Sequence, residues 1–140
     1  MILVDSDVLI AHLRGHQAAQ EWLLDARQAT GPLAVSVVSI SEVAGGMRSP
    51  ERRQVSRLLS SLRTFAITER IGWRAADFMR AYRRSHQGIG LGDYLIAATA
   101  DVEGLDLATL NVRLYPMIEA LKAPFRLLRS ERATMAPPTS

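Results

Sequence analysis

MILVDSDVLIAHL, residues 1–13, joins a short apolar run to an acidic turn and then to a second, periodic apolar pattern. Residues 2–4 are apolar and β-forming, which predicts a buried strand. Asp5-Ser6-Asp7 ends that run, and the apolar positions that follow recur at helical spacing. In an open α/β sheet such a turn lies at the carboxyl end of a strand, where ligands bind. For this turn alone, a helix cap made by Asp5 or Ser6 is the simpler explanation.

The alternation of strand and helix patterns continues along the chain. Helical segments separate further short apolar runs, which predict strands at residues 33–38, 65–68 and 105–109, with a fifth candidate at 125–128. Such alternation is typical of a parallel sheet covered by helices on both faces, here an α/β fold with four to five strands. We expect one domain over residues 1–130 and a disordered tail over residues 131–140.

The composition indicates a globular chain, with 48% hydrophobic and 22% charged residues and no cysteine. The lack of cysteine excludes disulfides, thiolate zinc sites and a cysteine nucleophile. No apolar run is long enough to span a membrane and no basic signal region opens the sequence, so we expect a cytoplasmic protein without a membrane partner. Lys122 is the only lysine among 17 basic residues. Arginine binds phosphate bidentately, which is compatible with a nucleic-acid partner, although a GC-rich genome gives the same bias.

Three acidic residues and one asparagine share a setting next to the predicted strands. Asp5 follows the first strand, Glu42 lies four residues past the second, and Asp93 opens the helix before the fourth. Asn111 follows the fourth strand. Because parallel strands end at one edge of a sheet, we expect these side chains to converge. Converging carboxylates without a nearby lysine repel one another, and a hydrated Mg²⁺ or Mn²⁺ ion would remove that repulsion.

Each acid also has a purely structural explanation. Ser39 and Glu42 match the S-x-x-E capping box, and the helix dipole favours Asp93 in a first turn. Asp7 fits a solvated first-turn residue. Capping explains any one of these residues better than catalysis does, so the prediction of a metal site depends on three acids meeting at one edge.

Four short segments carry these residues: DSDVLI at 5–10, SEV at 41–43, LGDYLIAAT at 91–99 and TLNVR at 109–113. In order and spacing they resemble the PIN-domain ribonucleases, and most of all the VapC-type toxins of bacterial toxin–antitoxin pairs. The resemblance runs from the first residues to about Pro116. It implies a three-layer αβα sandwich, a homodimer, and a cognate antitoxin whose tail enters the acidic groove.

The resemblance also assigns roles to individual residues. The family's first three acids fall on Asp5, Glu42 and Asp93, while its fourth position, commonly Asp, falls on Asn111. It implies Mg²⁺-dependent hydrolysis of RNA phosphodiester bonds that leaves a 5′-phosphate, with Asp5 and Asp93 as direct ligands and the other two completing the shell. Leu114 stands where relatives often have a further acid, which, together with Asn111, favours one metal ion over two.

The remaining basic residues are less specific. Arg80, Arg83 and Arg84 share a helical face and are candidates for RNA contact, although an ordinary solvated face explains them about as well. The three histidines, His12, His16 and His86, lie outside the four segments, and we expect them at the surface or in packing.

Two other functions fit parts of the sequence. A strand followed by Asp5-x-Asp7 is also the opening signature of haloacid-dehalogenase-type phosphohydrolases, which need a lysine for the phosphoryl group, and Lys122 is the only candidate. The second is a non-catalytic PIN-like module that binds nucleic acid or a partner protein. Asn111 mildly favours that module, whereas the three acids argue against it.

Overall fold

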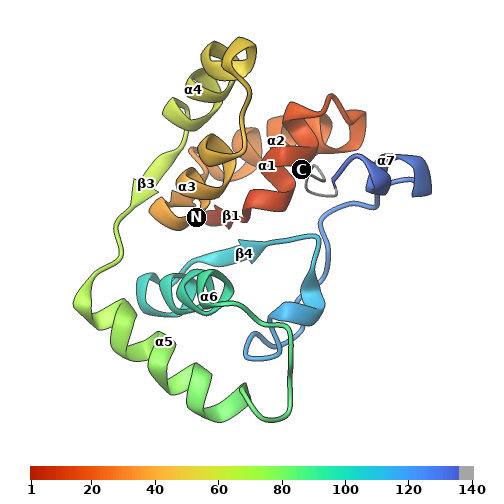
Figure 1. Ribbon diagram of the computed structural model, residues 1–140. Coiled ribbons are helices and arrows are strands. Elements are labelled where there is room, and N and C mark those ends of the chain that lie inside the picture. Colours follow the sequence, from red (N-terminus) through yellow and green to blue (C-terminus); the bar gives the residue numbers. More distant parts are fainter. Residues whose placement is uncertain (136–140) are drawn as a thin grey trace.

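The computed structural model describes residues 1–135, which fold around a four-stranded parallel sheet of order β3-β2-β1-β4 (Figure 1). The strands are β1 (Ile2–Val4), β2 (Ala34–Ser36), β3 (Arg63–Phe65) and β4 (Asp106–Ala108). In β1, Leu3 stands opposite Ala34 of β2 and Leu107 of β4. The chain therefore proceeds to one side of β1 through β2 and β3 and returns to its other side with β4. The carboxyl end of β1 lies at this switch in strand order, which is the usual ligand position in such sheets.

Helices connect the strands and cover both faces of the sheet. They are α1 (Ser6–Leu13), α2 (Gln17–Thr30), α3 (Val37–Gly45), α4 (Arg52–Ser60), α5 (Glu69–Tyr82), α6 (Leu91–Glu103) and α7 (Arg129–Ala133), with 3₁₀ turns η1 (Ser49–Glu51) and η2 (Val112–Leu114). Leu3 belongs to a buried cluster with α5 and α6, while the next residue, Val4, belongs to a second cluster with α1–α4. Successive strand residues point to opposite faces, so two cores flank one sheet. The predicted αβα sandwich is confirmed.

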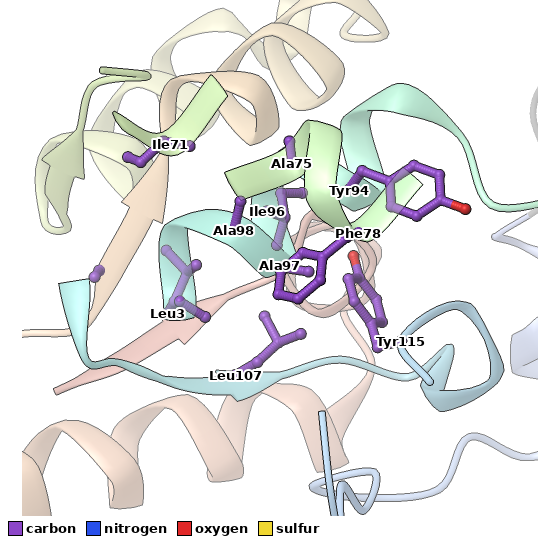
Figure 2. Close-up of a cluster of buried hydrophobic side chains, with 12 residues drawn as sticks. Leu3, Ile71, Ala75, Phe78, Tyr94, Ile96, Ala97, Ala98, Leu107 and Tyr115 are labelled. Atoms are coloured by element: carbon purple, nitrogen blue, oxygen red, sulfur yellow. The ribbon is translucent and has the colours of Figure 1, made fainter. Parts of the chain in front are cut away.

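The core on the α5–α6 side fixes the helix that carries Asp93. Ile71, Ala75 and Phe78 form the buried stripe of α5 and pack toward α6 (Figure 2). The segment from Tyr94 to Ala100 is almost wholly buried, because α6 lies between the sheet and α5. A helix packed on two sides has little freedom to move, which gives the acid in its first turn a fixed position.

Helix α3 begins earlier than the sequence indicated. The side chain of Ser36 accepts a hydrogen bond from Val38 N–H (3.1 Å) and caps the helix, so the strand predicted at residues 33–38 ends at Ser36. Ser39 is fully buried inside the helix rather than at its cap. The capping-box explanation of Glu42 is therefore wrong, and Glu42 lies beyond the first turn.

The C-terminal segment differs from the prediction. Residues 125–128 form no strand, and Phe125 instead packs on Trp22 of α2, with ring centroids 6.3 Å apart. Residues 131–135 of the predicted disordered tail include most of α7, and the predicted domain bounds stay a prediction. The remainder of that tail, residues 136–140, lies outside the described residues.

His16 joins α7 to the body of the fold. His16 is 8% exposed; its imidazole Nδ1 lies 3.0 Å from Glu131 Oε2 and its Nε2 lies 2.7 Å from Thr134 Oγ1. These contacts link residues more than a hundred positions apart, so local sequence patterns do not reveal them. Within residues 1–135, no helix has both the length and the apolar character needed to cross a bilayer.

Candidate functional site

Asp5 lies at the carboxyl end of β1 and also caps α1. Its backbone N–H donates to Ala108 O (2.9 Å), which extends the pairing of β1 with β4, and its side chain is 5% exposed. Asp5 Oδ1 accepts from Ser6 N–H (2.8 Å). The cap anticipated from the sequence is therefore present, but it uses only one carboxylate oxygen.

The second oxygen of Asp5 accepts from two buried hydroxyls. Thr109 Oγ1 and the Tyr115 hydroxyl each donate to Asp5 Oδ2, at 2.8 Å. Thr109 is fully buried and Tyr115 is 1% exposed. Neither residue was assigned a role from the sequence. Thr109 lies directly after β4, so its place at the site could have been predicted from the sequence. Tyr115 follows the irregular turn η2, and no sequence pattern predicts its position.

Asp93 and Glu42 are connected to Asp5 through hydroxyl groups. Asp93 Oδ2 accepts from Gly90 N–H (2.9 Å) at the start of α6, and its Oδ1 lies 3.5 Å from the Tyr115 hydroxyl. Glu42 Oε1 on α3 accepts from Ser6 Oγ (3.3 Å). The three acids predicted from the sequence are therefore brought together at one edge of the sheet.

A glycine allows α3 and α6 to approach each other at this edge. A Cβ atom on Gly92 would lie 3.3 Å from Val38 Cγ1 of α3, closer than side chains normally pack. Glycine at this position thus lets the helix of Asp93 lie against the helix of Glu42.

The acids interact electrostatically. Burial raises the pKa of Asp5, and the charge of Asp93 raises it further. Partial burial and the charges of Asp5 and Asp93 raise the pKa of Glu42, although this side chain is the most exposed of the three. Across residues 1–135, no arginine, lysine or histidine forms an ion pair with any of these acids. A divalent cation would offset the repulsion between these carboxylates.

The donor chemistry at this edge suits a hard, partly hydrated cation. Carboxylate and hydroxyl oxygens are the ligands that Mg²⁺ and Mn²⁺ prefer. In the part of the chain that the structure describes, no three acidic or histidine side chains enclose an ion position on their own. Mg²⁺ usually keeps several waters and is bound through one or two protein carboxylates.

Asn111 lies at the same edge but is exposed. Its backbone N–H donates to Thr109 Oγ1 (3.1 Å), and the residue lines a cavity of about 500 Å³ together with Asp7. Leu114, by contrast, packs against the core on the α5–α6 side. The side-chain role predicted for Asn111 stays a prediction.

The predicted RNA-contacting arginines lie at the C-terminal end of α5. Arg80, Arg83 and Arg84 are all exposed. Within residues 1–135 they form neither ion pairs nor hydrogen bonds with the acids, so their role also stays a prediction.

Asp7 is not the solvated residue that the sequence suggested. Its Oδ2 accepts from Leu110 N–H (3.0 Å) and lies 3.3 Å from Thr109 Oγ1. Its Oδ1 is buried and has no hydrogen-bond partner among residues 1–135. Burial and the neighbouring charge of Asp5 raise the pKa of Asp7 to about 7.

The fold and its acidic edge agree with the chain's relationships to known proteins. The family model described as PIN domain matches residues 2–117, and the chain belongs to the PIN-domain family. Within that family it is a VapC-type toxin. It is similar to Ribonuclease VapC10 of Mycobacterium tuberculosis, with 67% identity over 125 residues that cover 89% of this chain and 93% of that protein. Ribonuclease VapC19 of the same organism is 39% identical and is covered completely, again by 89% of this chain.

A solved structure shares the fold. A toxin–antitoxin complex from Klebsiella pneumoniae contains a chain that aligns with a TM-score of 0.74 at 26% identity, over 91% of this chain and all of that one. The family assignment decides against the haloacid-dehalogenase-type alternative. Lys122, the lysine that this alternative needs, is exposed and lies outside the matched residues.

Proposed function

We propose that this chain is an endoribonuclease that hydrolyses RNA phosphodiester bonds with Mg²⁺, or with Mn²⁺ in its place, as the toxin of a toxin–antitoxin pair. The observation that carries the proposal is the linked cluster of Asp5, Glu42 and Asp93, which lacks a cationic partner among residues 1–135. The names of VapC10 and VapC19 as ribonucleases support RNA as the substrate class.

In this proposal each acid has a defined task. Asp5 and Asp93 are direct metal ligands, and Glu42 and Asn111 complete the shell, directly or through water. When bound, the ion supplies an activated water and neutralises negative charge on the scissile phosphate. Hydrogen bonds from Ser6 and Thr109 orient the Asp5 carboxylate, and the Gly90 N–H orients that of Asp93.

The proposed partners are a cognate antitoxin and a second copy of the chain. The toxin–antitoxin complex from Klebsiella pneumoniae supports the first. Exposed apolar side chains support a further protein contact, since Trp73 on α5 is 69% exposed and Leu91 at the start of α6 is 61% exposed. The exposed Arg80, Arg83 and Arg84 are the proposed RNA contacts.

Metal dependence is the first test. We expect the purified chain to cleave a single-stranded RNA in Mg²⁺, to be inactive in excess EDTA, and to recover when Mg²⁺ is restored. Gel analysis of labelled RNA measures the outcome. RNA binding without cleavage in Mg²⁺ or Mn²⁺ would instead support the non-catalytic module.

Glu42→Gln separates a catalytic role from a structural one. Gln retains an oxygen that accepts from Ser6 Oγ, so we expect the free energy of unfolding to stay within about 1 kcal/mol of wild type, the size of a typical single hydrogen bond. The lost charge should lower cleavage by about 10- to 100-fold, as is usual for a residue that supports a metal site. Urea denaturation and cleavage rates measure both, with the exposed Glu119→Gln as the control. Normal cleavage combined with lower stability would make Glu42 structural.

Variants of Asn111 test how many metal ions the site binds. With a neutral side chain there, we expect calorimetric titration to show one Mn²⁺ ion per chain. Asn111→Asp should tighten Mn²⁺ binding, and Asn111→Ala should weaken it less than Asp5→Ala, because a carbonyl contributes less than a carboxylate. If Asn111→Ala and Asp5→Ala lose Mn²⁺ affinity equally, Asn111 is a primary ligand. If Asn111→Asp binds Mn²⁺ as wild type does, the side chain of Asn111 does not face the site.

A further inference from the structure

The Tyr115 hydroxyl lies between two acids that come from distant parts of the chain. It donates to Asp5 Oδ2 at 2.8 Å and lies 3.5 Å from Asp93 Oδ1. Asp5 ends β1 and Asp93 begins α6, so this phenol connects the central strand to the helix packed beside it. With 1% of its surface exposed, Tyr115 is shielded from water, and its hydroxyl has few competing partners.

The tyrosine ring itself is firmly held. Its backbone N–H donates to Val112 O (3.1 Å), and its carbonyl accepts from Ile118 N–H (3.1 Å). The ring belongs to the buried cluster that also contains Phe78 and Leu107 (Figure 2). Because both the backbone and the ring are fixed, the hydroxyl occupies a defined point rather than following the acids.

The hydrogen bonds of the two carboxylates show how the Tyr115 hydroxyl lies between them. Ser6 N–H occupies Asp5 Oδ1, and Thr109 shares Oδ2 with Tyr115. Gly90 N–H occupies Asp93 Oδ2, which leaves Oδ1 on the side of the tyrosine. The phenol therefore stands where one oxygen of each acid faces the other.

The phenol remains a hydrogen-bond donor in this setting. A phenol is protonated at neutral pH, so this hydroxyl keeps its hydrogen. This neutral O–H donates a hydrogen bond to Asp5 Oδ2 and lies between that oxygen and Asp93 Oδ1, so it separates the two negative charges. Without it, Thr109 alone would donate to Asp5 Oδ2, an apolar ring edge would face Asp93 Oδ1, and repulsion would turn the two carboxylates away from each other.

We propose that Tyr115 is a positioning residue whose hydroxyl holds Asp5 and Asp93 at a fixed spacing, so that the two carboxylates receive a divalent ion without rearranging. This inference rests on the proposed function, because it requires that the acids bind metal. Residues that orient metal ligands typically change metal affinity by about 10- to 100-fold when they are replaced. Since Tyr115 is buried and acts through the acids, its effect falls on metal binding and on kcat rather than on KM for RNA.

The test compares two single-hydroxyl deletions in the same cluster. Tyr115→Phe removes the bridging hydroxyl and keeps the ring. Tyr94→Phe is the matched control: Tyr94 is 3% exposed, adjoins Asp93 in sequence, and its hydroxyl points away from the cluster (Figure 2). Among residues 1–135, that hydroxyl donates no hydrogen bond to the acids.

Calorimetric titration with Mn²⁺ alone measures affinity without reference to activity. We expect Tyr115→Phe to bind Mn²⁺ about tenfold or more weakly than wild type and Tyr94→Phe to bind as wild type does. In cleavage assays, kcat of Tyr115→Phe should fall at low Mn²⁺ and recover at high Mn²⁺, with KM for RNA unchanged. Wild-type affinity in Tyr115→Phe, or equal losses in both variants, would overturn the proposal.

Two outcomes separate this inference from the proposed function. If wild type binds Mn²⁺ and cleaves RNA while Tyr115→Phe behaves identically, only the positioning role is wrong. If wild type neither binds Mn²⁺ nor cleaves RNA, the proposed function and the inference both fail. Should Tyr115→Phe be destabilised, the same titrations at a lower temperature, at which circular dichroism shows both variants to be folded, decide the question.

Discussion

Asp5→Asn and Asp93→Asn should each abolish RNA cleavage while leaving the fold intact. Each change removes one charged metal ligand and keeps one oxygen, which still accepts from Ser6 N–H or Gly90 N–H. At Asp5 the hydroxyls of Thr109 and Tyr115, which can both donate and accept, turn to accept from the new amide group. Charge stabilisation by a bound metal is worth several kcal/mol, so the rate should fall by at least about a thousandfold. Because the charge of Asp93 raises the pKa of Asp5, and both charges raise the pKa of Glu42, removing one charge should also raise the melting temperature of the metal-free protein.

Cleavage of labelled RNA in Mg²⁺ and calorimetric melting in EDTA measure the two effects. Asp101→Asn is the matched control, because Asp101 also lies on α6 but is exposed and is paired with Arg74 at 2.7 Å. It should cleave RNA at the wild-type rate and gain no stability. Wild-type cleavage by Asp5→Asn or Asp93→Asn would show that the acidic cluster is not the catalytic centre.

The features predicted correctly from the sequence are those with local causes. A β-forming run that ends in Asp5-Ser6-Asp7 and is followed by helical periodicity leaves few alternatives to a strand, a turn and a helix. Once several such units alternate, the parallel sheet follows, and its geometry brings Asp5, Glu42 and Asp93 to one edge. Distant acids were therefore predictable neighbours without any knowledge of side-chain contacts.

The features that were missed depend on contacts between distant segments. Ser36 and Ser39 are both plausible caps, and only the packing of α3 selects Ser36. Tyr115 reaches the acids after an irregular turn whose path no periodic pattern specifies. The docking of α7 depends on His16, more than a hundred residues earlier in the chain. Local patterns contain none of this information.

The burial of Asp7 also depends on contacts between distant segments. It should make the stability of the fold depend strongly on pH. Leu110 N–H and Thr109, both following β4, close over the carboxylate and leave Oδ1 buried without a partner among residues 1–135. Its pKa rises from an ordinary value of 3.8 to about 7. A raised carboxyl pKa stabilises the fold fully below pH 3.8, and this contribution is lost as the pH rises toward about 7. One pKa unit corresponds to about 1.4 kcal/mol, so ionised Asp7 costs on the order of 4 kcal/mol.

Asp7→Asn should therefore stabilise the metal-free protein in a pH-dependent way. The amide oxygen still accepts from Leu110 N–H, and no charge is left to bury beside Asp5. At pH 8 we expect the variant to exceed wild type by a few kcal/mol, whereas at pH 4.5, closer to the ordinary pKa of 3.8, this advantage should shrink to about 1 kcal/mol. Urea denaturation in EDTA at both pH values measures this difference, and the exposed Asp25→Asn, which should change neither value, is the control. An equal advantage at both pH values would mean that the carboxylate of Asp7 is not the source of the instability.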